Sequence, residues 1–538
     1  MDRMNRREFC KVGLSVAAGA AAARSEYVAR PNIVLFYADD LDADEIGCLA
    51  ASKNYPHYTG AARLGFAAAR GYADARMLTP NIDALAREGA EFRRFYATSP
   101  VCTPSRCSIL TGHYASRAPG FMERYPAGGP SVITWNTPIM REETNVAKEL
   151  KRLGYATGMV GKWHNFPGQE RVAEIDKSFA EQDDPRDSKI KRRLEQKQER
   201  ARIALTEHYG WDFADRINYG NTEQSLPVAV RGQNLEWHTE GALEFLARNH
   251  IRPFFLYYAL PVPHGQYNNL RKLDSLATAA GMLDKPAGGQ PSRASIHERL
   301  KAAGIDERNA MATWMDDAVG AILKAVDQYG LTRNTIVLFI SDNPTRGKNS
   351  CYEGARLPAL VRWPARLKPG TKVDALCANV DIPATLIEAA GGKLSGAAMG
   401  DGRSFLPQMT GSPQPPDWRR QLLLEIHHSR AVVTRQWKYI ANRAPAEIAA
   451  AMQAEAKAVA EGKGERTIGW NGLNHHNFNA ERDFPAYFDT DQLYDLDQDL
   501  YERRNLAAAK PDILADMKKR LCELLAPLPH TFGEFKTE

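Results

Sequence analysis

A short segment, SPVCTPSRCSILTG at residues 99–112, brings a thiol close to a guanidinium and raises the question of what the thiol does. Cys102 precedes Pro104 by two residues and Arg106 by four, and Cys107 follows directly. We expect Cys102 on a proline-containing turn just before a helix that starts at SILTG. Four uses of the thiol are open: an inert buried side chain, half of a disulfide, a thiolate nucleophile, or enzymatic oxidation to an aldehyde.

The chemistry around Cys102 bears on these four uses. A disulfide between Cys102 and Cys107 would enclose a proline in a tight loop, which disulfide geometry disfavours. A thiolate nucleophile needs a paired histidine, and carboxylates nearby would raise the pKa of the thiol and keep it protonated.

Such carboxylates follow two apolar runs of the chain. Asp39 and Asp40 end one predicted strand, and Asp342 and Asn343 end another. Two adjacent carboxylates repel one another unless a cation lies between them. A ligand set of oxygens alone selects a hard cation, Ca²⁺ or Mg²⁺, over zinc. The alternative is a helix cap at one position and a turn at the other, but the recurrence at two strand ends favours a metal site.

Strands and helices alternate along most of the chain, which is typical of an α/β fold with a large, mainly parallel sheet sandwiched by helices. Ligands bind such sheets at the carboxyl ends of the strands. The polar clusters lie at those ends, including Lys162 and His164 after one strand and His264 after another. Buried strands are predicted at 31–40, 250–264 and 334–343, helices at 79–92 and 311–331, and a helix followed by a strand in TNVAKELKRLGYATGMVGKWH.

The chain divides into a larger and a smaller unit. Residues 24–410 are expected to form the catalytic domain, with insertions around 49–78 and 166–236. The second insertion contains RDSKIKRRLEQKQERAR, which predicts a solvated helix, with a polyanion-facing patch as the alternative. After the linker GSPQPPDW, residues 411–538 are expected to form an α+β subdomain with a short antiparallel sheet.

The first 23 residues have the character of an export signal of the twin-arginine type. Arg6 and Arg7 precede an Ala-rich apolar run that is too short to span a bilayer, so stable membrane insertion is not expected. The sequence thus predicts a periplasmic or extracellular bacterial protein. The formal charge of +5 indicates no nucleic-acid partner, and the scattered cysteines form no structural zinc motif.

Cys102-Thr103-Pro104-Ser105-Arg106 resembles the C-x-P-x-R signature of the formylglycine-dependent (type I) sulfatases, in the alkaline phosphatase superfamily. The resemblance covers nearly the whole chain apart from the signal and the insertions, and it implies an alkaline phosphatase-like fold. Further blocks resemble the family in family order: PNIVLFYADDL, TPNIDALAREGAEF, GKWH, RPFFLYYALPVPH, DDAVGAILKAVDQYGL, NTIVLFISDN, GKNSCYEGARLPALVRWP, VDIPATLIEAAGG, RAVVTRQWKYI and QLYDLDQDLYERRNLA.

The resemblance implies that a maturation enzyme converts Cys102 to formylglycine, whose hydrate is a geminal diol. It also implies a divalent cation, usually Ca²⁺ with Mg²⁺ as the alternative, bound by Asp39, Asp40, Asp342, Asn343 and an oxygen of the modified Cys102.

The resemblance carries further roles to five positions. Arg106, with the cation, would stabilise the ionised hydroxyl of the diol as nucleophile. Lys162 and Lys348 would grip the sulfate oxygens. His264, alone or with Lys348, would donate a proton to the departing alcohol, and His164 would take the proton whose loss expels sulfate and restores the aldehyde.

The expected function is therefore hydrolysis of sulfate monoesters, with a sulfated carbohydrate or polysaccharide as the preferred substrate and a small ester as the alternative. A phosphonate or phosphodiester hydrolase on the same scaffold is a rival, and so is a non-catalytic glycan-binding relative. Pro344 stands where the family usually has glycine, so the shape of the following loop departs from the family pattern.

Overall fold

The computed structural model describes ten ranges of the chain and the single residue Lys348. The predicted export signal lies outside the described residues, as do most of the insertion at 49–78 and part of the insertion at 166–236. The described ranges are 30–50, 76–168, 179–222, 226–264, 270–344, 350–352, 355–393, 400–412, 415–463 and 484–535.

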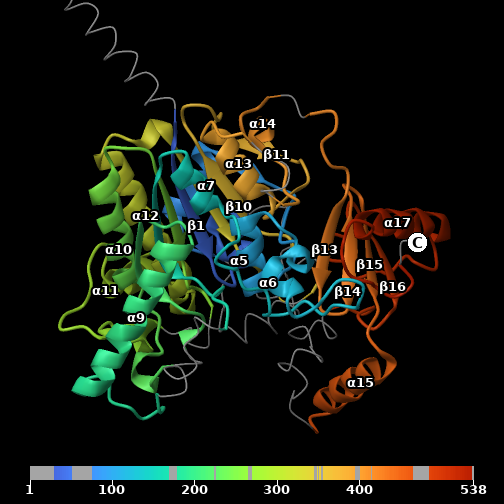
Figure 1. Cartoon of the computed structure of the whole chain (residues 1–538), viewed down its shortest axis with the longest axis horizontal. Helices are drawn as coiled ribbons and strands as arrows, with labels where there is room; N and C mark the ends of the chain where they lie inside the picture. The colour runs from blue at the N-terminus through green and yellow to red at the C-terminus, as the bar shows by residue number, and fades with distance from the viewer. Residues whose placement is uncertain are drawn as a thin grey trace, which may run out of the picture.

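An eight-stranded sheet forms the centre of the molecule (Figure 1). Its strand order is β11-β2-β10-β9-β1-β6-β4-β5, and the five strands from β9 to β5 run parallel. Only β10 runs antiparallel to its neighbours within this sheet. The strands are β1 (Asn32–Ala38), β2 (Ala90–Phe92), β4 (Ala156–Lys162), β5 (Phe213–Asn218), β6 (Phe254–Ala259), β9 (Thr335–Ser341), β10 (Ala359–Arg362) and β11 (Thr371–Val373).

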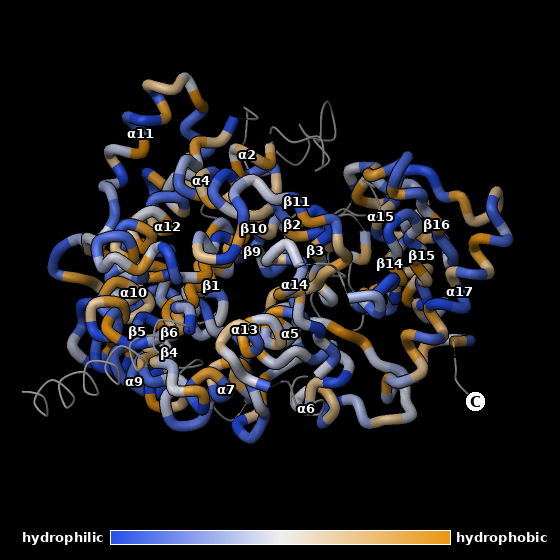
Figure 2. The backbone as a smooth tube through the Cα atoms, turned by 90° about the horizontal axis from the view of Figure 1, so that it is seen from above, coloured by the Kyte–Doolittle hydropathy of each residue, from blue (hydrophilic) through white to orange (hydrophobic). Residues whose placement is uncertain are grey.

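Helices cover both faces of this sheet (Figure 2). One face packs against α5 (Cys102–Thr111), α7 (Val146–Arg152) and α13 (Asp381–Ala389), and the other against α4 (Pro80–Glu88), α10 (Leu235–Asn249) and α12 (Ala310–Gln328). A strand between two helical layers must be apolar on both sides, which explains the continuous apolar run of β1. The predicted α/β sandwich is confirmed. Further helices are α2 (Gly47–Ala50), α6 (Pro119–Met122), α9 (Ser188–His208), α11 (Arg293–Ala302) and α14 (Leu406–Met409).

A second, antiparallel sheet lies beside the first, nearer the C-terminus (Figure 1). Its strands are β13 (Leu422–Ile426), β14 (Ser429–Val433), β15 (Trp437–Asn442) and β16 (Asp491–Asp495). Helix α17 (Pro511–Leu525) packs on it through Met517 and Leu521, and α15 (Ala446–Ala460) follows β15. The predicted small antiparallel sheet is confirmed, while the division at residue 411 stays a prediction. Two-residue strands pair as β3 (Phe95–Tyr96) with β12 (Cys377–Ala378) and β7 (Ala277–Thr278) with β8 (Gly281–Met282).

The helix predicted over 79–92 is shorter than expected. It ends at Glu88, and residues 90–92 form β2 between β10 and β11. A Cβ on Gly89 would lie 2.0 Å from the carbonyl oxygen of Val361, so this close approach to β10 requires a glycine. The tertiary contact, which the local pattern does not contain, ends the helix.

The prediction that Cys102 lies on a turn is wrong. Cys102 is the first residue of α5, and the Ser105 N–H donates to the Val101 carbonyl at 3.0 Å. Pro104 is tolerated because N–H groups in the first turn of a helix need no partner within the helix.

The helix predicted within RDSKIKRRLEQKQERAR is confirmed as α9, with Asp187 accepting hydrogen bonds from the N–H groups of Lys189 and Ile190 as its N-cap. Within the described ranges, every helix is too short or too polar to cross a membrane.

The N-terminus of α4 is held by a residue that is distant in sequence. Asp316 on α12 accepts hydrogen bonds from the N–H of Asn81 at 3.2 Å and the N–H of Ile82 at 2.8 Å. Burial raises the pKa of Asp316 to about 7, against the lowering effect of these donors. Thr79, at the N-cap position, instead donates its hydroxyl to Asp83. Asp316 therefore performs the capping role and ties α4 to α12.

We expect Asp316→Ala to lower the free energy of unfolding by about 1–3 kcal/mol, because two helix N–H groups lose their acceptor. Urea unfolding of the full chain measures the change. Asp327→Ala, at an exposed carboxylate of the same helix, is the control and should change it by less than about 0.5 kcal/mol. Equal losses in the two variants would contradict the capping role.

Candidate active site

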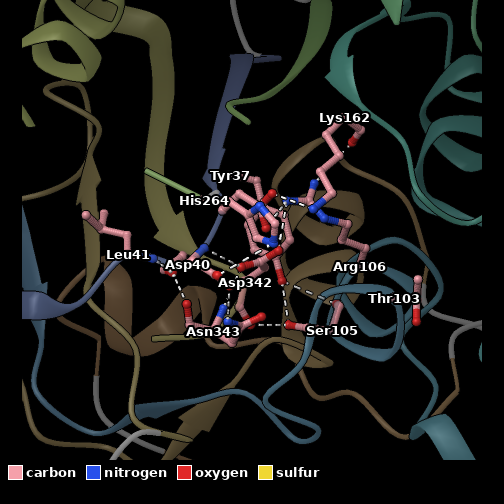
Figure 3. A network of polar contacts seen from close by, with 12 residues as sticks. Tyr37, Asp40, Leu41, Thr103, Ser105, Arg106, Lys162, His264, Asp342 and Asn343 are labelled. Atoms are coloured by element: carbon pink, nitrogen blue, oxygen red, sulfur yellow. Dashed lines mark hydrogen bonds and ion pairs between the residues drawn. The ribbon is translucent and has the colours of Figure 1, made fainter. Parts of the chain in front are cut away.

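The ends of four parallel strands, together with helix α5, bring most of the predicted residues to one edge of the sheet, and Figure 3 shows several of these side chains close together. Asp39 and Asp40 follow β1, and Asp342 and Asn343 follow β9. The register pairs Ala38 with Ser341, so the two carboxylate segments leave the sheet side by side. The Asp342 N–H donates to the Ala38 carbonyl at 2.9 Å, and the Asp40 N–H donates to Asp342 Oδ1 at 3.1 Å.

Asp40 has a backbone conformation that is rare for a residue with a side chain. Its φ is +60°, in the left-handed region, and such conformations concentrate at functional sites. The Leu41 N–H donates to Ser341 Oγ at 3.2 Å and holds the bend after it. Asp40 Oδ1 accepts a hydrogen bond from Asn343 Nδ2 at 2.6 Å. These hydrogen bonds therefore hold both the backbone after β1 and the side chain of Asp40 in place.

Three buried cations are paired with the three buried carboxylates. Lys162, at the end of β4, donates to Asp39 Oδ2 at 2.5 Å. Lys348 Nζ lies 2.8 and 2.9 Å from the two carboxylate oxygens of Asp40. Arg106, on α5, donates to Asp342 Oδ2 at 2.8 Å and lies 3.4 Å from Asp39 Oδ1. Buried charges persist only when they are paired in this way.

The carboxylates differ in how well their charge is compensated. Burial alone would raise the pKa of Asp39, but the charges of Lys162, His264 and Arg106 hold it well below the usual range. Burial and the neighbouring Asp39 raise the pKa of Asp342 to about 8, although Arg106 acts in the opposite direction. The two carboxylates thus differ in pKa although each has a cationic partner.

Cys102 lies in the middle of the carboxylate cluster. Its sulfur is within 4.8 Å of ligand atoms of Asp39 and Asp342, and also of Asp40 and His264. Burial raises the pKa of the thiol to about 12, although Lys162 and Lys348 lower it. The thiol is therefore protonated at neutral pH and is a poor nucleophile as it stands.

The disulfide alternative for Cys102 is wrong. Both Cys102 and Cys107 are free thiols. Cys107 lies in the core on the face of the sheet that packs against α5, α7 and α13, with its sulfur 3.7 Å from Thr111 Oγ1.

Sequence reasoning missed the hydrogen bonds that tie α5 to the chain after β9 and to β1. Ser105 Oγ donates to the Asp342 carbonyl at 2.6 Å, lies 2.7 Å from the Tyr37 hydroxyl and accepts from Asn379 Nδ2 at 3.0 Å. The spacing of three residues between Cys102 and Ser105 puts both on one face of a helix, which could have indicated the role. No comparable signal marked Asn379.

Asn221 was also missed. Its Oδ1 accepts a second hydrogen bond from Lys162 Nζ at 2.7 Å. Asn221 belongs to the predicted insertion at 166–236, so the insertion contributes to the site.

The two predicted histidines are placed differently. His264 Nε2 lies 3.7 Å from Asp40 Oδ2, and burial lowers the pKa of His264 to about 4 against the opposing charge of Asp40. His164 follows β4 with a φ of +64°. Its N–H donates to the Tyr219 carbonyl at 2.9 Å, and a Cβ on Gly220 would lie 2.9 Å from its ring. The contacts described for His164 thus run to the loop after β5, whereas His264 lies against the carboxylates.

The donor set fits a hard divalent cation. Asn343 Oδ1 is buried and has no hydrogen-bond partner among the residues that the structure describes. Asp39 Oδ1 likewise accepts no hydrogen bond there and has only the 3.4 Å contact with Arg106. Buried oxygens without donors are acceptors available to a cation, and oxygen is the ligand type that Ca²⁺ and Mg²⁺ prefer.

Comparisons with known proteins identify the family of the chain. The profile of the family described as Sulfatase matches residues 31–392, and the one described as N-sulphoglucosamine sulphohydrolase, C-terminal, matches residues 348–444. Human arylsulfatase A is 27% identical over 584 residues, which cover 97% of this chain and 92% of that protein. An N-acetylgalactosamine-6-O-sulfatase of Bacteroides thetaiotaomicron is 26% identical, with 91% and 92% covered.

A solved structure described as a complex with its substrate, D-glucosamine-2-N,6-O-disulfate, superposes with a TM-score of 0.57. It is 17% identical, and the match covers 92% of this chain and 97% of that one, which shows a shared fold. The match to the Sulfatase profile spans more than half of the chain and includes all ten predicted site residues. The chain therefore belongs to the formylglycine-dependent sulfatases of the alkaline phosphatase superfamily, which are sulfuric ester hydrolases.

Proposed function

We propose that this sulfatase is an exported enzyme that removes sulfate from a sulfated carbohydrate, using a formylglycine made from Cys102 and a bound Ca²⁺ ion. In the overall reaction, water and a sulfate monoester give an alcohol, sulfate and a proton. The observation that carries the proposal is the position of the Cys102 sulfur, within 4.8 Å of ligand atoms from both groups of acidic residues. A buried, protonated thiol among carboxylates is a poor nucleophile, which favours its conversion to another reactive group.

The substrate class is inferred from relatives. The 24% identical relative from Formosa agariphila is named an ulvan-active sulfatase, and the Bacteroides thetaiotaomicron relative is named for N-acetylgalactosamine 6-sulfate. Export is inferred from the twin-arginine segment at residues 1–23, and maturation of Cys102 implies a formylglycine-generating enzyme as partner.

The residues that would hold the cation are the four oxygen-bearing side chains at the ends of β1 and β9, together with the matured Cys102. When bound, the cation supplies Lewis acidity and the aldehyde hydrate supplies a hydroxyl nucleophile. These ligands are Asp39, Asp40, Asp342 and Asn343.

Two lysines of the chain bind the sulfate group in this proposal, and Arg106 stabilises the hydroxyl nucleophile. Lys162, Lys348 and Arg106 now compensate Asp39, Asp40 and Asp342. With a divalent cation held by Asp39, Asp40, Asp342 and Asn343, the ammonium groups of Lys162 and Lys348 would bind the sulfate oxygens. Preorganised cations stabilise the negative charge that develops during transfer.

Two histidines move protons. His264 donates a proton to the oxygen of the departing alcohol, and Asp40 at 3.7 Å favours the protonated ring. His164 accepts the proton whose removal releases sulfate.

The first prediction from the proposed function concerns the maturation of Cys102. In protein produced with a formylglycine-generating enzyme, mass analysis should find the peptide containing Cys102 lighter by about 18 Da, the difference between thiol and aldehyde. Cys102→Ala should lower kcat for an aryl sulfate by about 10³-fold or more, because the nucleophile is lost. Fully active protein with an unmodified thiol would refute the mechanism, and a faster reaction with a phosphate diester would favour the phosphodiesterase rival.

The second prediction concerns the general acid. His264→Ala should lower kcat by about 10²–10⁴-fold for a sugar sulfate, whose alcohol must be protonated as it leaves. The loss should be much smaller for nitrophenyl sulfate, whose leaving group needs no proton. His208→Ala, at the end of α9, is the control and should leave both rates unchanged. Equal losses for both substrates would show that His264 is not the acid.

The third prediction concerns the cation. At a Ca²⁺ concentration about 100-fold above the dissociation constant, the free energy of unfolding should rise by about 2.7 kcal/mol. Chelation should reverse the gain and abolish turnover, and parallel titration with Mg²⁺ identifies the preferred ion. Asn343→Ala should weaken binding measured by calorimetry, whereas Asp284→Asn, at an exposed acid, should not. Full turnover after exhaustive chelation would contradict the cation's role.

A further inference from the structure

A second cleft lies away from the catalytic cluster. It has a volume of about 970 Å³, and none of the ten predicted site residues lines it. Its walls are the segment from β11 to Leu376, the chain just before β13, the turn between β14 and β15, and helix α17. The cleft thus lies where the large sheet and the small sheet meet.

The described lining of this cleft is rich in basic side chains. Six of these residues are arginine or lysine and three are aspartate. Four of the six cations have carboxylate partners, namely Arg94 with Asp497, Lys372 with Glu91, Arg419 with Asp381 and Arg520 with Asp516. These four ion pairs neutralise most of the positive charge in the lining of the cleft.

The remaining two cations, Arg420 and Arg435, have no carboxylate partner among the residues that the structure describes. Both are exposed, Arg420 just before β13 and Arg435 on the turn between β14 and β15. Two uncompensated guanidinium groups around one concave surface create a positive potential there. Guanidinium groups bind tetrahedral oxyanions with two parallel hydrogen bonds, so the surface suits sulfate.

Gln408 provides an independent sign that this cleft has a ligand. It lies on α14, lines the cleft and is only 9% exposed. Neither its amide nitrogen nor its amide oxygen has a hydrogen-bond partner among the described residues. A buried amide without partners costs about 1–3 kcal/mol, so its retention needs a reason. An amide that both donates and accepts suits a sugar hydroxyl.

We propose that this cleft is a second, non-catalytic binding site for a sulfated oligosaccharide segment. Arg420 and Arg435 bind sulfate groups, Gln408 bonds to a hydroxyl, and the partly buried Trp437 offers an aromatic surface to a sugar ring. The volume lies at the upper end of the range of about 300–1,000 Å³ that is usual for small-molecule sites. The choice of a sulfated sugar as ligand rests on the proposed function. Binding one part of a polymer here raises its local concentration at the catalytic cluster.

The test measures binding and catalysis separately. In Cys102→Ala protein, which does not degrade the probe, binding of heparin and of dextran sulfate is measured by calorimetry. The double variant Arg420→Ala/Arg435→Ala should raise the dissociation constant by about tenfold. With Cys102 intact and matured, the same pair should leave kcat/KM for a small aryl sulfate unchanged and lower the rate on the polymer.

Two further variants separate the proposal from general electrostatics. Arg252→Ala/Arg333→Ala removes the same charge from exposed positions outside the cleft and should leave the dissociation constant within about twofold. Gln408→Leu should weaken heparin binding while the melting temperature stays equal or rises, because an unpaired buried amide is removed. If Gln408 had only a structural role, the substitution would lower the melting temperature and leave heparin binding unchanged.

Three outcomes would overturn the proposal: unchanged binding in the Arg420/Arg435 variant, equal weakening in the Arg252/Arg333 control, or equal affinity for a short DNA duplex. Failure of the proposed function is detected by a different measurement, in which matured protein does not turn over the small aryl sulfate. Heparin binding to the cleft can then still be measured, so the two failures are distinguishable.

Discussion

The site depends on one constraint, the charge balance of three carboxylates and three cations buried in the same small volume. Asp39, Asp40 and Asp342 are each within hydrogen-bond distance of a lysine or arginine. The effective cost of burying an unpaired ion is several kcal/mol, so none of these side chains can be lost or moved without disturbing its partner. Burial and the neighbouring Asp39 raise the pKa of Asp342 to about 8, although Arg106 donates to its carboxylate at 2.8 Å.

The strand register converts this balance into a fixed geometry. Ala38 pairs with Ser341, so the acidic residues that follow β1 and β9 emerge together. A slip of one residue would send these side chains to opposite faces of the sheet. Helical layers on both faces bury every residue of β1 and hold the register. A catalytic cluster built on strand ends is therefore more rigid than one built on loops alone.

Much of the site and the central fold could be predicted because the signals are local. Apolar runs that end in acidic residues mark the buried strands, and the C-x-P-x-R motif identifies Cys102 and Arg106, although the start of helix α5 at Cys102 was not predicted. The misses have tertiary causes. The helix at residue 80 ends early because Gly89 approaches β10, and its cap comes from Asp316 on another helix.

By itself, the sequence determined which chemical groups are present, which of them end strands, and the family to which their order belongs. The tertiary structure alone decided which groups meet: Lys162 with Asp39, 123 residues away, and Asn379 with Ser105, 274 residues away. It also formed the second cleft, whose walls come from both sheets. Local periodicity in the sequence indicates whether a residue is buried or exposed. Its contact partners depend on the order of the strands in the sheet, and one pattern of alternating strands and helices is compatible with several strand orders.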